Sequence, residues 1–265
     1  MKVFISVDIE GINGICCWDE TDPKYARYNE FKQELQKEVK AACLGAIEAG
    51  ATEIIIKDAH DSARNLDITD LPDCVTLIRG WEGGVCSMMA GLTDDVDAVM
   101  FVGYHSPSRS DGNSLSHTMN TRIHHVKING QIASEFMINS LYASTKNVPV
   151  AFLSGDENLT KLVKEANCCI ETVASKKGMH GATVSKHPSV TQKEIYEGVQ
   201  VALKKCTKDN VVELPKHFDV EIQYKNHLDA FRSSFFPGCK LSGTDRVIFS
   251  SDNYYDVLVM LKFIL

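Results

Sequence analysis

The chain has 265 residues, of which 44% are hydrophobic and 24% are charged, and its formal net charge is −7. This composition is that of a globular protein with a substantial core, and the negative charge argues against a general nucleic-acid binder. No apolar run reaches the roughly 18 residues of a membrane span, and acidic residues follow the first strand too soon for a secretion signal. We therefore expect a cytoplasmic protein without membrane or nucleic-acid partners.

The first part of the chain alternates short β-rich runs with helical stretches. Strands are expected at residues 3–9, 52–57, 75–78, 97–102 and 148–153. Helices are expected at residues 28–49 and 134–144, and a short helix is expected to end at Met89. Strands separated by helices predict an α/β fold, with a mostly parallel sheet and helices on both of its faces.

The rest of the chain has a different pattern. A hairpin over residues 126–132 is expected to turn at Asn129-Gly130. From Leu159 onward the pattern is helix, strand, helix, followed by strands at 218–224 and 246–250. We expect a catalytic α/β domain over residues 1–190 and a smaller C-terminal α+β lobe over residues 191–265.

Acidic and histidine side chains stand at the ends of several expected strands. Asp8 and Glu10 close the first strand, and two residues of a strand at this spacing point to the same face. His60 follows the second strand and His105 the fourth. Open α/β sheets bind their ligands at the carboxyl ends of strands. Because adjacent carboxylates are costly without a positive charge between them, a divalent metal is the most economical partner.

The candidate site contains three acids and three histidines: Asp8, Glu10, His60, His105, His117 and Glu135. Zinc prefers these ligand types, as do manganese and iron in sites richer in oxygen. The set exceeds what one tetrahedral ion needs and fits two ions about 3.5–4 Å apart, bridged by one carboxylate, for which Asp8 is the natural choice. A helix dipole alone could also explain Glu135. Ligating imidazoles usually donate their other N–H to an oxygen, and at His60 the candidates are Asp58 and Asp61.

The remaining histidines and the cysteines carry no comparable pattern. His124 and His125 face opposite ways on a hairpin strand and are interpreted as structural. The other histidines lack acids at metal spacing and should be solvated or locally hydrogen-bonded: His180, His187, His217 and His227. The nine cysteines include no Cys-x-x-Cys, which indicates reduced thiols.

Taken together, five segments resemble the zinc-dependent D-aminopeptidases of dipeptide-transport operons. The segments are Ser6-Val-Asp8-Ile-Glu10-Gly11-Ile-x-Gly14, Asp58-x-His60, Gly103-Tyr104-His105, Ser116-His117-Thr-Met119, and Glu135 with Asn139. They occur in the order of that family, and the similarity runs through residues 1–160, whereas the last third of the chain is less similar.

The resemblance implies a binuclear zinc site with two ions per chain. The positions that match its ligands are Asp8, which bridges, and Glu10, His60, His105 and Glu135. His117 matches a histidine that acts in catalysis rather than in metal binding. The implied reaction is hydrolysis of short peptides with an N-terminal D-amino acid by a water that the two ions activate, within a ring-stacked homodecamer. Ser134 departs from the pattern, because a glycine is expected before Glu135.

Two other functions use the same residue types. A dinuclear metal-dependent phosphatase or phosphodiesterase needs cations for its substrate, and only Arg109 and Arg122 lie near the motifs. A non-catalytic, metal-stabilised binding protein needs only four closed ligands, which leaves His117 without a role.

Overall fold

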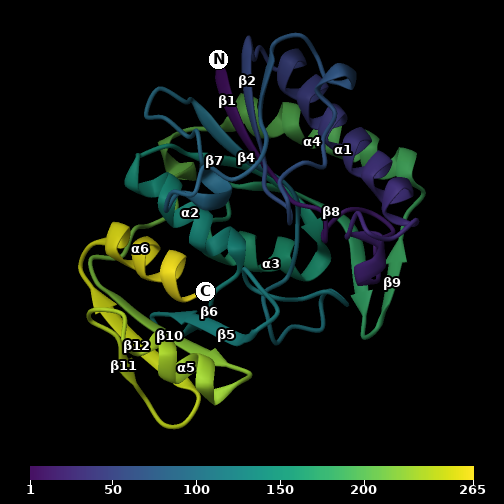
Figure 1. Ribbon diagram of the computed structural model, residues 1–265. Helices are drawn as coiled ribbons and strands as arrows, with labels where there is room; N and C mark the ends of the chain where they lie inside the picture. The colour runs from purple at the N-terminus through teal and green to yellow at the C-terminus, as the bar shows by residue number, and fades with distance from the viewer.

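The computed structural model describes residues 1–265 and contains two β-sheets (Figure 1). The strands are β1 (Lys2–Val7), β2 (Glu53–Asp58), β3 (Val75–Ile78), β4 (Ala98–Tyr104), β5 (Ile123–Ile128), β6 (Gln131–Ile132), β7 (Val150–Asp156), β8 (Glu171–Met179), β9 (Ala182–Ser185), β10 (Phe218–Tyr224), β11 (Lys240–Leu241) and β12 (Arg246–Ser251). The helices are α1 (Tyr28–Glu48), α2 (Glu135–Thr145), α3 (Glu157–Ala166), α4 (Pro188–Lys205), α5 (His227–Ser233) and α6 (Tyr254–Ile264), with the 3-10 helices η1 (Trp18–Glu20), η2 (Ile68–Asp70), η3 (Ser87–Met89) and η4 (Lys208–Asn210).

The first sheet has seven strands in the order β3-β2-β1-β4-β7-β8-β9. All neighbouring strands are parallel except β8 and β9, which confirms the mostly parallel sheet predicted from the sequence. The chain runs outward from β1 through β2 to β3 and then returns to β4 on the other side of β1. Open α/β sheets bind ligands where the strand order reverses in this way, which here is between the ends of β1 and β4.

Helices cover both faces of this sheet, as predicted. On one face, Val3 and Ile5 of β1 belong to a core cluster with buried residues of α1 and α4. On the other face, Phe4 belongs to a cluster with residues of α2, α3 and α6. Figure 1 shows α1 and α4 side by side on their face, and the two helices are in contact. No helix is both long enough and apolar enough to cross a bilayer.

The register of α1 follows from its buried stripe. Leu35, Val39, Ala42 and Ala46 recur at helical spacing and are fully buried. The helix ends before Gly50, whose φ of +101° is the left-handed conformation in which helices commonly stop. Burial of this stripe fixes α1 against the sheet, and Glu38 of the same helix accepts a hydrogen bond from the amide of Asn13 in the turn after β1.

The second sheet has the order β11-β12-β10-β5-β6 and is antiparallel. The hairpin of β5 and β6 turns at Asn129 and Gly130, both with positive φ, as the sequence predicts. This sheet joins strands from the middle of the chain to strands from its last part, at the lower left of Figure 1. The two-domain division at residue 190 stays a prediction.

Candidate metal centre

Asp8 and Glu10 lie just beyond β1 rather than within it. The strand ends at Val7, whereas the sequence led us to expect strand conformation through residue 9. The amide of Asp8 still donates to the carbonyl of Val102 at 2.9 Å, so pairing with β4 continues for one residue. Glu10 belongs to the turn that follows. The turn, and not the alternation of side chains along a strand, therefore sets the orientation of these two side chains.

Two glycines allow this turn to touch the end of β4. The amide of Gly11 donates to the carbonyl of Gly103 at 2.8 Å. A Cβ on Gly11 would lie 1.8 Å from the carbonyl oxygen of Tyr104, and a Cβ on Gly103 would lie 2.2 Å from that of Asp8. Gly103 also has a φ of +75°, which favours glycine. This close approach places Asp8 beside His105.

The carboxylate of Asp8 lies between two imidazoles. Its Oδ1 is 3.4 Å from Nδ1 of His60, and its Oδ2 is 3.4 Å from Nε2 of His105. On the first side, Oε2 of Glu10 is 3.1 Å from Nδ1 of His60. On the second side, Oε1 of Glu135 is 3.6 Å from Nε2 of His105. The donor atoms thus form two groups that share Asp8.

His117 completes the set on the solvent side. Its ring stacks on that of His105, with centroids 4.3 Å apart and planes 9° apart. Its Nε2 is 3.6 Å from Oε1 of Glu135, and the ring of Trp18 packs edge-on against it at 5.3 Å. The side chain of His117 is 14% exposed, more than any of the other five. The structure therefore brings together all six residues predicted from the sequence.

Each of the three imidazoles has one ring nitrogen fixed by a main-chain carbonyl. The hydrogen bonds, all 2.9 Å long, run from His60 Nε2 to Thr21, from His105 Nδ1 to Ser106 and from His117 Nδ1 to Leu115. A carbonyl only accepts, so each of these nitrogens carries a hydrogen. In the neutral ring the other nitrogen then presents its lone pair to the carboxylates, which is the arrangement of metal-ligating histidines.

The prediction that Asp58 or Asp61 accepts a hydrogen bond from His60 is wrong. Its second nitrogen bonds to Thr21 and not to Asp58 or Asp61. The carboxylate of Asp58 instead accepts from the main chain and the side chain of Asn65, and so fixes the loop after β2. Nothing in the sequence marks Thr21 as a neighbour, because it precedes α1 and reaches His60 only through the fold.

Ser134 causes no distortion at Glu135. Its φ of −85° and ψ of 166° are ordinary extended values, and its hydroxyl accepts from the amide of Met137 at 3.0 Å as the N-cap of α2. Glu135 is the first residue of that helix, and its Oε1 accepts from the amide of Met119 at 2.7 Å. Serine therefore replaces the expected glycine with a better helix cap.

Three buried atoms of this cluster have no hydrogen-bond partner: Asp8 Oδ2, Glu10 Oε2 and His105 Nε2. Burial raises the pKa of Asp8 to about 8, and the charge of Glu10 adds to this effect. Burial disfavours the charged form of His105, but the charge and hydrogen bond of Glu135, together with the charges of Asp8 and Glu10, outweigh it and raise the pKa of His105 to about 10. Buried acids with unpaired oxygens require positive charge. Inward-facing carboxylates and imidazoles are the donors that suit a divalent ion, so the residues fit a metal.

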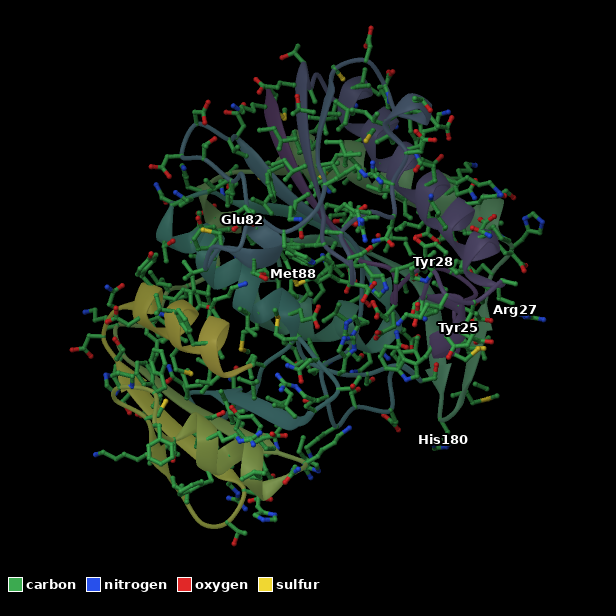
Figure 2. The ribbon with its side chains drawn as sticks, in the orientation of Figure 1. Tyr25, Arg27, Tyr28, Glu82, Met88 and His180 are labelled. Carbon is green, nitrogen blue, oxygen red and sulfur yellow. The ribbon has the colours of Figure 1, made fainter.

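Five of the six cluster residues line a cavity of about 640 Å³: Asp8, Glu10, His60, His117 and Glu135. Trp18 and Tyr25 contribute to its wall, as does Met88 of η3; in Figure 2, Met88 lies near the centre and Tyr25 to the right. Lys262 of α6 is the one lysine or arginine among the lining residues. Sequence analysis missed Trp18 and Lys262, since neither stands at a strand end or in a motif.

Comparison with known proteins gave three matches. The sequence profile of the M55 peptidase family, described as D-aminopeptidase, matches residues 1–263. A D-aminopeptidase of Bacillus subtilis (strain 168) is 27% identical over 266 residues, which cover 98% of this chain and 96% of that protein. The solved structure of the Zn-dependent D-aminopeptidase DppA from Bacillus subtilis, a self-compartmentalizing protease, superposes with a TM-score of 0.92 at 26% identity, over 100% of this chain and 96% of that chain.

Proposed function

This chain belongs to the M55 family and is a metal-dependent D-aminopeptidase, and on that premise we propose that its metal centre holds two zinc ions. Asp8 would be shared between the two ions. Glu10 and His60 would help to hold one of them, and His105 and Glu135 the other. The zinc-dependence of the Bacillus subtilis relative supports the choice of metal, as does the mixture of carboxylate and imidazole donors.

One observation supports two metal ions per chain rather than one. The two oxygens of Asp8 face different imidazoles, at 3.4 Å on each side, and each imidazole has its own second acid. A mononuclear site would gather its ligands around one point. Here the donor atoms form two groups that share one carboxylate, as in bridged two-metal hydrolases.

When bound, the two ions would acidify a water and polarise the scissile carbonyl of the peptide. His117 moves protons: its Nδ1 is held by the carbonyl of Leu115, so Nε2 takes a proton from the attacking water and returns it to the leaving amine. Trp18 packs against the ring and limits its rotation. The most exposed imidazole of the set thus acts in catalysis, and the more deeply buried ones bind metal.

An aminopeptidase also has to hold the free amino group of its substrate. Asp61 lines the cavity outside the ligand set. Among the hydrogen bonds and ion pairs of the chain, none involves its carboxylate, although its main-chain carbonyl accepts from Trp81. We assign the α-ammonium group to Asp61, which would select peptides with a free N-terminus.

We further propose that the chain assembles as a homo-oligomer, a decamer that encloses its active sites and admits short peptides. The similarity to a self-compartmentalizing protease over the full chain supports this. Exposed aromatic side chains on α5, α6 and the segment after α5 give a surface suited to burial between subunits, with Phe231 50%, Phe235 71% and Phe263 74% exposed.

The test combines elemental analysis with hydrolysis of D-Ala-D-Ala and L-Ala-L-Ala by the purified protein. We expect two zinc ions per chain and cleavage of the D-peptide in preference to the L-peptide. A fully active protein with one ion per chain would overturn the dinuclear centre. Hydrolysis of p-nitrophenyl phosphate without peptidase activity would favour the phosphatase alternative. Light scattering measures the assembly separately, and an active monomer would contradict the decamer.

A further inference from the structure

A second cavity, of about 260 Å³, lies beside the metal-centre cavity. The two share Ser87, Met119, Asn120 and Lys262 in their linings, so they adjoin one another. The second cavity differs from the first in character, because most of its lining residues are hydrophobic. Its apolar walls come from the residues just before η3, from α2 and from α6, through Val85, Ile138, Tyr142, Leu258 and Leu261.

Lys262 stands where the two cavities meet. Among the hydrogen bonds and ion pairs of the chain, none involves its ammonium group, although five carboxyl groups line the metal-centre cavity. The main-chain oxygen of Leu265, another residue of the second cavity, already accepts from Asn120 Nδ2 at 2.9 Å and from Arg122 Nη2. Lys262 is therefore a free cation at the edge of an acidic cavity and an apolar one.

We propose that Lys262 binds the terminal carboxylate of a dipeptide substrate and that the apolar cavity binds the side chain of its second residue. This inference rests on the proposed aminopeptidase function and names its substrate class: dipeptides with a D-residue first and an apolar residue second. Lys262 is a specificity-determining residue and the apolar cavity is the site that selects the second side chain.

Charge complementarity explains why the carboxylate goes to Lys262. Beyond the ligand set, the metal-centre cavity carries the acids Asp22 and Asp61, which attract the ammonium end of a peptide and repel its carboxylate end. A dipeptide is a zwitterion whose two charges flank the scissile bond. With its ammonium group at Asp61, its carboxylate meets Lys262, the one lysine or arginine that lines the cavity.

The size and chemistry of the second cavity explain the choice of side chain. A water molecule occupies about 30 Å³ of the liquid, so a cavity of about 260 Å³ accepts a side chain of several carbons. Each buried CH₂ group strengthens binding by about 4-fold. A leucine at the second position should therefore bind better than a glycine, whereas a charged side chain would lose its hydration there.

The first experiment compares D-Ala-D-Leu with its C-terminal amide, using the zinc-loaded protein. We expect the wild type to cleave the free acid with a kcat/KM at least about 10-fold above that of the amide, since a charged hydrogen bond is lost in the amide. Lys262→Met should raise KM for the free acid by about the same factor, leaving little difference between the substrates, and Lys262→Arg should restore the preference. Lys240→Met alters another exposed lysine, on β11, and serves as the matched control.

The second experiment compares D-Ala-D-Leu with D-Ala-Gly. We expect the wild type to prefer the leucyl substrate by about 10-fold or more. Val85→Phe, which fills part of the cavity, should raise KM for D-Ala-D-Leu more than for D-Ala-Gly. Thermal unfolding of each variant verifies that it folds.

The outcomes separate this inference from the function on which it rests. If the wild type cleaves D-Ala-D-Leu and its amide equally well, or if Lys262→Met lowers both activities by the same factor, Lys262 does not bind the carboxylate. If Val85→Phe leaves the leucine preference intact, the cavity does not bind the side chain. If the wild type cleaves no D-alanyl peptide at all, the proposed function itself fails.

Discussion

The two sheets of this protein both place histidines beside acids, with opposite results. In the antiparallel sheet, His125 Nε2 bonds to Glu221 at 3.0 Å, and Lys127 bonds to the same carboxylate at 3.0 Å. Just before β10 of that sheet, His217 bonds at 2.6 Å to Asp252, which follows β12, in an exposed pair. These groups satisfy one another locally, as expected for the histidines outside the motifs.

At the carboxyl end of the parallel sheet the same residue types do not satisfy one another. Oδ2 of Asp8, Oε2 of Glu10 and Nε2 of His105 are buried without hydrogen-bond partners. One ring nitrogen of each imidazole donates to a main-chain carbonyl, and this orients the other ring nitrogen toward the acids. The comparison teaches that a histidine near an acid does not mark a site. A site is marked by buried donor atoms that converge and still lack a partner.

The largest effect should follow from Asp8→Ala, which removes the group shared by both halves of the centre. We expect zinc to be lost from both sites and kcat/KM to fall by more than about 1,000-fold, because stabilisation worth several kcal/mol is lost with the metals. Elemental analysis and steady-state hydrolysis of D-Ala-D-Ala measure the two effects. A variant that kept two zinc ions would show that Asp8 is not the bridge.

His117→Ala should separate catalysis from metal binding. We expect kcat to fall by about 100-fold to 10,000-fold, which is the usual contribution of a general acid or base. The zinc content should match that of the wild type, since five ligands remain. Loss of one zinc ion per chain would instead make His117 a ligand of the side that contains His105 and Glu135, whose donor atoms lie within 4.8 Å of its own.

Glu38 tests whether an unpaired buried atom suffices to make a site. Its Oε2 is the fourth such atom in the chain, but no histidine faces it, and its Oε1 accepts only from the amide of Asn13. Burial raises its pKa from 4.5 to about 8. It is thus a neutral acid in the folded protein at pH 7, and its substitution should affect stability rather than zinc content.

The sign of this effect follows from proton binding. Between pH 4.5 and about pH 8 the folded protein keeps a proton on Glu38 that the unfolded chain has lost. The free energy of unfolding therefore falls as the pH rises through this window, by about 5 kcal/mol in total. In Glu38→Gln this decrease should be absent. Urea unfolding of the wild type and of Glu38→Gln at pH 5 and pH 8 measures this decrease. Equal pH dependence of the two proteins would show that Glu38 does not keep a proton in the folded state.

The smallest effect should come from His217→Ala, just before β10 of the antiparallel sheet. His217 bonds to Asp252, which raises its pKa, but the pair is exposed. Exposed pairs contribute little, so zinc content and kcat/KM should equal those of the wild type. A substantial loss of either would mean that the antiparallel sheet supports the metal centre, and the contrast between the sheets would no longer hold.

Much of the parallel sheet could be predicted from the sequence, because its signals are local. Short apolar runs such as residues 75–78 and the buried stripe of α1 have the periodicity of their elements. Asp8, His60 and His105 could be assigned to one site because the ends of parallel strands meet at one edge of a sheet. The chemistry of carboxylate and imidazole then indicated a metal.

Other features were decided by the tertiary structure alone. Thr21, rather than Asp58 or Asp61, orients His60, and Lys262 reaches the metal-centre cavity from the last helix. The pairing of β5 with β10 likewise joins segments distant in sequence. The sequence by itself determined most strands of the parallel sheet, the helix α1, the ligand types and the strand ends that carry them, since these depend on a few neighbouring residues. Which carbonyl holds an imidazole and which cation borders the cavity depend on the path of the whole chain, because such contacts form only when distant segments pack together.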